Sequence, residues 1–171
     1  HTNAARGIKF SPDGKWLVSV GSDRTIVLYD GKSGDFIKKV EKAHEGGISA
    51  VSWFPDSATF VTASADNTVK RWSVDDLLEK QTYRHSSDTS VDYQQVGVVV
   101  TKEHVLSLSL NGEINLYSHD DSVPCEVIHG HQRALTNCLI MKDHFISGGS
   151  DGTLFQHEID DGEMKSSAKL F

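Results

Sequence analysis

The stretch ISAVSWFPDSATFVTASADNTVKRWSV, residues 48–74, alternates short runs of apolar and β-branched residues with two tight turns. Pro55-Asp56-Ser57 occupies the first turn and Ala65-Asp66-Asn67 the second, and these are residue types that favour turns. Apolar runs bounded in this way predict β-hairpins. The strands expected from this pattern lie at 48–53, 60–63, 69–72 and, beyond the quoted stretch, within 79–84.

The second turn of this stretch recurs along the chain. The related segments are GSDRTIVLYD at 21–30, SADNTVKRWS at 64–73, SLNGEINLYS at 109–118 and GSDGTLFQHE at 149–158. Their acidic or amide residues are separated by 43, 45 and 40 residues, and an aromatic or imidazole ring follows each of them by six positions. A repeat period near forty is typical of the blades of a β-propeller.

The repeats predict an all-β protein of about four consecutive four-stranded propeller blades, at approximately 1–43, 44–84, 85–130 and 131–171. Stacking around an axis buries blade faces that a single blade leaves exposed. At this period a seven-bladed ring needs about 300 residues. We therefore expect residues 1–171 to be one partial propeller, with the tail 163–171 as its last outer strand.

Four polar positions recur inside the repeats at matching spacing. They are a histidine before the first strand, a hydroxyl in the second, the turn residue, and the ring in the third. The sets are His1, Ser19, Asp23 and Tyr29; His44, Thr62, Asp66 and Trp72; His131, Ser147, Asp151 and His157; and, without the histidine, Ser107, Asn111 and Tyr117. This array resembles WD40 repeats, in which such residues form a buried hydrogen-bonded chain that holds each blade together.

A serine, a histidine and an aspartate in one repeat could also be a hydrolase triad. A nucleophile needs exposure, an oxyanion hole and one site per molecule, whereas this trio recurs at the spacing of the fold. The structural interpretation is therefore preferred, and we expect no enzyme activity and no catalytic site. The chain has no nucleotide-binding glycine loop, and its nine histidines lack the paired clusters typical of zinc sites, so we expect no cofactor and no metal.

Charge and hydropathy narrow the possible partners. The chain has 17 basic and 24 acidic residues, a net charge of −7, and no basic run that could follow a phosphate backbone, which argues against nucleic acid. No stretch approaches the ~20 apolar residues that span a bilayer, so we expect no membrane insertion. Cys125 and Cys138 are interpreted as reduced core thiols rather than a disulfide, as expected of a cytoplasmic protein.

Three stretches carry a more specific resemblance. Residues 21–41, 48–74 and 92–118, in this order and followed by GHQRALTNCLI at 130–140, resemble the actin-interacting protein 1 family in its fungal form. The resemblance implies two joined seven-bladed propellers that bind actin filaments together with cofilin, promote filament disassembly and cap severed ends at the actin cytoskeleton. The third repeat departs from the pattern because it lacks the histidine, and the fourth because His157 replaces the tryptophan.

In a propeller, the loops that enter each first strand and the turns between second and third strands open on the same face. Exposed tyrosine and arginine are enriched at binding hot spots, and the loop 85–95 is polar and longer than its counterparts. The candidate partner-binding residues on this face are Arg24, Lys42, Glu45, Asn67, Arg84, Asp88, Asp92, Tyr93 and Arg133. The alternative interpretation is an unrelated WD40 scaffold or the substrate-receptor subunit of a multiprotein complex.

Overall fold

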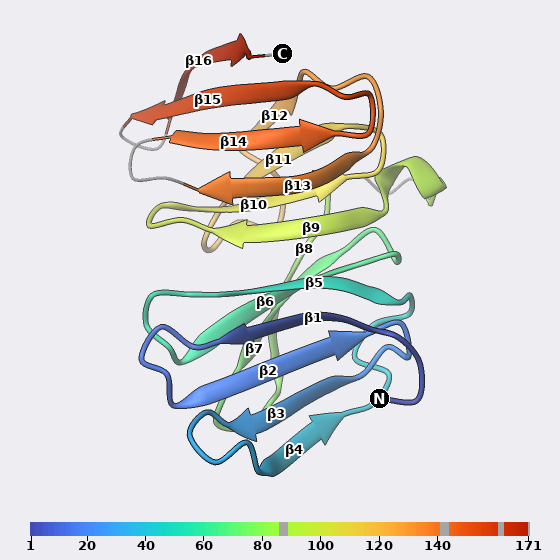
Figure 1. Ribbon diagram of the computed structural model, residues 1–171, viewed down its shortest axis with the longest axis vertical. Helices are drawn as coiled ribbons and strands as arrows, with labels where there is room; N and C mark the ends of the chain where they lie inside the picture. The colour runs from blue at the N-terminus through green and yellow to red at the C-terminus, as the bar shows by residue number, and fades with distance from the viewer. Residues whose placement is uncertain (86–88, 141–143, 161–162, 171) are drawn as a thin grey trace.

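The computed structural model describes residues 1–85, 89–140, 144–160 and 163–170, and these form four antiparallel sheets of four strands each (Figure 1). Within every sheet the strands follow one another in chain order. The expected all-β architecture of consecutive four-stranded blades is therefore confirmed.

The strand bounds follow the repeat. Blade one consists of β1 (Ala5–Phe10), β2 (Trp16–Gly21), β3 (Ile26–Asp30) and β4 (Phe36–Val40). Blade two consists of β5 (Ile48–Trp53), β6 (Thr59–Ser64), β7 (Val69–Ser73) and β8 (Glu79–Tyr83). Blade three, preceded by the 3₁₀ turn η1 (Val91–Tyr93), consists of β9 (Gln95–Val100), β10 (His104–Ser109), β11 (Glu113–Ser118) and β12 (Glu126–His129). Blade four consists of β13 (Leu135–Ile140), β14 (His144–Gly149), β15 (Leu154–Asp160) and β16 (Glu163–Lys169).

The turn between the second and third strands has the same backbone form in every blade. Its second residue has a positive φ, and this residue is Arg24 (63°), Asn67 (67°), Gly112 (93°) or Gly152 (80°). Glycine and asparagine adopt this left-handed conformation readily, whereas an arginine there costs roughly 1 kcal/mol. The residue before it caps the turn, as when the Asp66 carboxylate accepts from the backbone amide of Thr68 at 3.0 Å.

The hydrophobic core lies between blades, not inside them. Innermost strand β5 contacts both β1 and β9, and β9 also contacts β13, so the blades stack side by side (Figure 1). At each junction, one blade contributes the sheet face that carries its recurring hydroxyl and ring. The preceding blade contributes the sheet face that does not carry them. The residues joining blades one and two include Val18, Val20, Ile26, Leu28, Phe60 and Trp72. Equivalent clusters join blades two and three and blades three and four.

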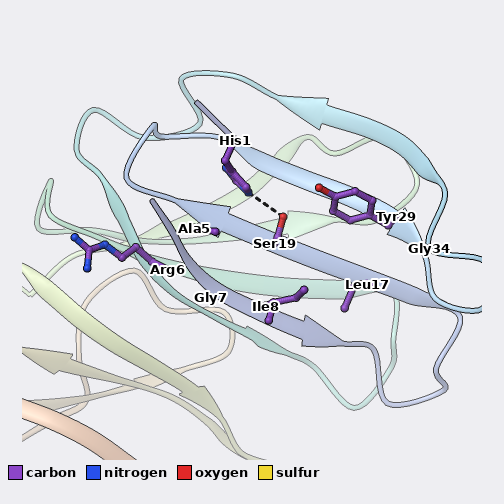
Figure 2. Close-up of a pocket in the computed structure, with 9 residues that line it drawn as sticks. All are labelled: His1, Ala5, Arg6, Gly7, Ile8, Leu17, Ser19, Tyr29 and Gly34. Atoms are coloured by element: carbon purple, nitrogen blue, oxygen red, sulfur yellow. Dashed lines mark hydrogen bonds between the residues drawn. The ribbon is translucent and has the colours of Figure 1, made fainter. Parts of the chain in front are cut away.

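Blade one presents its own hydroxyl-bearing face outward. Ile8, Phe10 and Phe36 are 61%, 59% and 60% exposed. Beside them lies a cavity of about 440 Å³ that is lined by His1, Ser19 and Tyr29 among others (Figure 2). No helix among the described residues is long and apolar enough to cross a membrane.

Candidate functional site

The four recurring residues of blade two form one connected chain of hydrogen bonds. The indole Nε1 of Trp72 donates to Thr62 Oγ1 at 2.9 Å, and Thr62 Oγ1 lies 2.8 Å from His44 Nε2. His44 Nδ1 lies 2.9 Å from Asp66 Oδ2. Because an indole can only donate, the single hydroxyl proton of Thr62 is free to go to His44 Nε2, which makes His44 Nδ1 the donor to Asp66. One arrangement of protons thus satisfies the whole chain.

Asp66 is the anchor of this chain. Burial alone would raise the pKa of the Asp66 carboxyl, but hydrogen bonds from His44, from the Thr68 hydroxyl and from the backbone amide of Glu45 hold this pKa well below its usual range. Asp66 is therefore a structural anion that fixes the loop entering the blade to the turn that follows the second strand.

The sequence analysis missed the threonine two residues after the turn aspartate. Thr68 Oγ1 donates to Asp66 at 2.6 Å and also lies 3.2 Å from His44 Nδ1. In blade four, Thr153 is the group that contacts His131 Nδ1, at 2.9 Å, while it donates to Asp151. The detectable signal is the triplet Asp-x-Thr, which recurs at 23–25, 66–68 and 151–153.

Blade one keeps the first three residues of the chain of bonds. His1 Nδ1 lies 2.9 Å from Asp23 Oδ1, and His1 Nε2 lies 2.8 Å from Ser19 Oγ. Figure 2 shows this imidazole directed at Ser19, with Tyr29 on the adjoining strand. The Tyr29 ring packs edge-on against Phe36, with the ring centroids 6.5 Å apart. The tyrosine therefore contributes packing at the position where Trp72 contributes a donor.

Blade four substitutes a histidine for the indole. Ser147 Oγ lies 2.8 Å from His131 Nε2 and 2.8 Å from His157 Nε2. The Asp151 carboxylate lies 3.7 Å from His131 Nδ1. It accepts instead from the Thr153 hydroxyl and from the backbone amide of Gln132. The link from aspartate to histidine thus runs through the threonine hydroxyl.

Blade three has a different polar core. Asn115 Nδ2 lies 3.3 Å from Ser107 Oγ and 2.9 Å from Ser109 Oγ, and Gln95 Nε2 donates to Ser109 at 3.0 Å. The Asn111 side chain caps its own turn, by accepting from the backbone amide of Glu113 at 3.1 Å. Burial raises the pKa of the Tyr117 phenol to about 12, against a smaller opposing effect of its hydrogen bond with Ser107. An amide network therefore stands where the other blades have a histidine.

The recurring hydroxyls are buried in the blades. Thr62 and Ser147 are 0% exposed, and Ser19, which lines the cavity on the outward face of blade one, is 5% exposed. No group of three or more His, Cys, Asp or Glu side chains is arranged to hold a metal ion in the part of the chain that the structure describes.

The candidate partner-binding residues that the structure describes fall into three groups. The exposed ones are Lys42, Glu45, Arg84, Asp92 and Arg133, and the half-buried ones are Arg24 and Tyr93. Asn67 is 6% exposed, and its amide donates to the carbonyl of Ser90 at 2.9 Å, so it supports the loop and is not part of its surface. Asp88 lies outside the described residues.

Two backbone contacts refine where these residues lie. The Arg84 amide donates to the Ser122 carbonyl at 2.9 Å, which places Arg84 beside the long loop between β11 and β12. The Asn111 amide donates to the Asp92 carbonyl at 2.9 Å, which fixes η1 against the turn of blade three. Figure 1 shows η1 at the edge of the stack, where β9 begins.

Comparison with known proteins shows which family and which relatives these repeats resemble. A family described as "WD domain, G-beta repeat" matches residues 1–30 and 35–73. The chain is 38% identical over 171 residues to "WD repeat-containing protein 1" of Gallus gallus, an alignment that covers 95% of this chain and 28% of that protein. The Mus musculus protein of the same name is 39% identical over 142 residues, covering 81% of this chain and 23% of that protein.

A further relative carries a more informative name. "Actin-interacting protein 1" of Drosophila melanogaster is 32% identical over 158 residues, covering 90% of this chain and 26% of that protein. The chain thus spans about a quarter of the length of these relatives. Among solved structures, the crystal structure of the computationally designed Ika4 protein has a TM-score of 0.77 at 22% identity and covers 94% of each chain, a likeness of fold alone.

Proposed function

Because this chain is built from WD40 repeats and resembles proteins named WD repeat-containing protein 1 and actin-interacting protein 1, we propose that it is part of a cytoplasmic protein that binds actin filaments. The observation that carries this proposal is the 32% identity, over 90% of the chain, to a relative whose name states an interaction with actin. The finer proposal is that the protein cooperates with cofilin to promote filament disassembly and end capping, as the resemblance implies.

The placement of the loops supports a binding function. The candidate residues lie in loops that enter first strands or in turns between second and third strands, and loops on a stable scaffold commonly carry binding residues. Asp92 of η1 is exposed and Tyr93 is half-buried, and the turn of blade three holds this segment in place through the backbone amide of Asn111. Tyrosine and arginine near such a segment are typical of interface anchors.

We further propose that the protein acts by binding and not by bond-making chemistry. The hydroxyls that could serve as nucleophiles are buried in the blades. Both ring nitrogens of His44 are engaged in the chain of bonds that ends at Asp66, so this imidazole is not free to act as a general base.

The test is cosedimentation of the protein with actin filaments, bare and decorated with cofilin. The variant Asp92→Ala with Tyr93→Ala removes two of the three side chains of η1, and the matched control Lys32→Ala with Asp35→Ala changes the exposed loop between β3 and β4. We expect pelleting that increases with cofilin, is reduced in the η1 variant and is unchanged in the control, with equal melting temperatures for all three proteins.

Two results would contradict parts of the proposal. Absence of pelleting by the unaltered protein would remove the actin function and favour the alternative, a scaffold or substrate-receptor subunit, because the fold alone does not fix the function. Equal pelleting of the η1 variant would keep actin binding but move the contact away from η1.

A further inference from the structure

The first strand of every blade contains one extra residue at the same place. Its pairing with the second strand shifts by one residue near its start, so that one residue of the first strand has no partner opposite it. These bulge residues are Arg6 in β1, Ser49 in β5, Val96 in β9 and Thr136 in β13. A β-bulge redirects the side chain of the extra residue, and bulges are frequent beside functional sites.

The four bulge residues line one cavity. Strands β1, β5, β9 and β13 follow one another along the stack, and each is an edge strand of its own sheet (Figure 1). Together they border a cavity of about 570 Å³, which is within the usual size of ligand-binding pockets. Because edge strands present unpaired backbone N–H and C=O groups, this cavity offers main-chain partners to an extended peptide.

Three of the four bulge residues serve the fold. The Ser49 hydroxyl contacts the Gln95 carbonyl oxygen at 2.7 Å, which ties blade two to blade three. Thr136 Oγ1 donates to the Gly148 carbonyl at 3.0 Å within blade four. Val96 packs against the core cluster that joins blades three and four. These side chains therefore have structural roles that account for their presence.

Arg6 is the exception among the bulge residues. Its side chain is exposed, its Nε donates to Ser22 Oγ at 2.9 Å, and no carboxylate of the described chain forms an ion pair with it. Figure 2 shows this side chain extending from β1 away from Ile8 and Ser19. The terminal N–H groups of the guanidinium are thus free, and such a fork binds a carboxylate in a bidentate manner.

The remaining lining makes the cavity suitable for an anion with apolar neighbours. Lys9 also lines it and forms no ion pair with any described acid. No aspartate or glutamate is among the described lining residues, although the whole chain has 24 acidic and 17 basic residues. Much of the remaining lining is apolar, with Val98, Leu108 and Leu139 as examples. The cavity therefore combines local positive charge with apolar surface in an acidic protein.

We propose that this cavity binds an acidic peptide segment of a protein partner. A carboxylate of the segment pairs with the Arg6 guanidinium, Lys9 adds a second cationic contact, and an adjacent apolar side chain of the segment packs against the inner strands. The edge strands and the apolar lining favour a peptide over a free anion. The inference goes beyond actin binding and does not require actin to supply the segment, so the two proposals can fail separately.

The competing explanation is that Arg6 only supports the turn of blade one through Ser22. In that case Arg6→Gln lowers the melting temperature and leaves peptide binding unchanged. If Arg6 is a binding group, Arg6→Gln leaves the melting temperature unchanged, because the side chain is exposed, and weakens peptide binding. Lys9→Gln provides a second variant that does not touch the contact with Ser22.

The experiment uses two capped peptides that differ only in charge, acetyl-EVEV-amide and acetyl-QVQV-amide, with inorganic phosphate as a third probe. The backbone amide signals of Gly7 and Gly97, which line the cavity, are followed by NMR during each titration. The proteins are the unaltered chain, Arg6→Gln, Lys9→Gln and the matched control Lys102→Gln, whose side chain is 93% exposed in the loop after β9.

We expect the acidic peptide to shift both glycine signals saturably in the millimolar range in the unaltered chain and in Lys102→Gln. Binding should be about tenfold weaker in Arg6→Gln and also weaker in Lys9→Gln, and the neutral peptide should shift neither signal. The proposal is wrong if the acidic peptide gives no saturable shift, if the neutral peptide acts equally, or if Arg6→Gln binds as well as the parent. Phosphate binding as strong as that of the acidic peptide would contradict a peptide site and indicate a site for simple anions.

Discussion

His157 Nε2 lies 2.8 Å from Ser147 Oγ in blade four, at the place where blade two has Trp72 Nε1 2.9 Å from Thr62 Oγ1. The Thr153 hydroxyl gives its proton to Asp151, so His131 Nδ1 must donate to Thr153 and His131 Nε2 must accept from Ser147. Because the Ser147 hydroxyl proton goes to His131, the contact between Ser147 Oγ and His157 Nε2 requires His157 Nε2–H to donate. The histidine thus acts as a neutral donor, as the indole does.

This arrangement predicts that blade four is sensitive to acid. Burial, and secondarily the charge of His131, lower the pKa of His157 to about 4 from an ordinary value of 6.5. The unfolded chain therefore binds a proton at His157 that the folded chain excludes. The contribution of neutral His157 to the free energy of unfolding is fully present above pH 6.5 and is lost as pH decreases toward 4. The loss should approach about 3 kcal/mol. Urea unfolding at a series of pH values measures it.

The control for this prediction is His157→Gln, which keeps an N–H donor but does not titrate in this range. Other groups titrate in both proteins, so the informative quantity is the difference between their pH profiles. Parallel profiles between pH 7 and pH 4 would show that His157 is not the acid-sensitive group.

Asp66→Ala should destabilise blade two by about 2 kcal/mol, because it leaves the buried donors of His44 and Thr68 without an acceptor. Since the pKa of Asp66 is lowered on folding, its contribution is present above pH 3.8 and lost below it. Thermal unfolding at pH 7, with the exposed Asp121→Ala as control, measures the effect. A melting temperature equal to that of the parent would refute the anchoring role of Asp66.

Gly112→Ala should destabilise the chain more than Gly152→Ala does. Both glycines have positive φ, so alanine costs roughly 1 kcal/mol at either position. A Cβ on Gly112 would also lie 2.6 Å from the His131 carbonyl oxygen and 2.7 Å from that of Arg133, whereas a Cβ on Gly152 meets nothing within 4 Å. Chemical denaturation of both variants measures the difference. An equal decrease in the free energy of unfolding for the two variants would mean that the loop entering blade four does not depend on this close contact.

The two cysteines should differ in reactivity. Cys125 is exposed, whereas burial raises the pKa of the Cys138 thiol to about 12, so little thiolate forms there at neutral pH. A thiol-disulfide reagent should modify Cys125 rapidly at pH 8 and Cys138 only after denaturant is added. Peptide mapping after brief labelling identifies the residue, and rapid labelling of Cys138 in the folded chain would contradict the prediction.

Sequence alone predicts the blade pattern well because that pattern is local. The turns after residues 23, 66, 111 and 151 are set by residues that favour tight turns, and alternating apolar residues fix which strand face is buried. The expected fourth strand within 79–84 is β8, Glu79–Tyr83, and the tail expected to complete the last blade contains β16, Glu163–Lys169. The Asp-x-Thr triplet was equally available in the sequence, although its role was missed.

The tertiary structure decided what each recurring polar residue does. The same register position holds a donor in Trp72, a packing ring in Tyr29 and a neutral imidazole in His157. These roles follow from partners contributed by other strands, and spacing along the chain does not reveal them. Asn67 is a similar case, because its bond to Ser90 buries a side chain that the sequence places on an exposed turn.

The sequence by itself therefore determined the four-blade repeat, the turn chemistry and the positions of the polar chains, because each depends on neighbours within one hairpin or at fixed spacing. Only the tertiary structure brought Glu113 between His85 and His129, which lie 28 and 16 residues away from it in opposite directions. The physical reason is that packing of the entering loop and the outer strand around one turn sets the distances among these three side chains, and no local pattern encodes that packing.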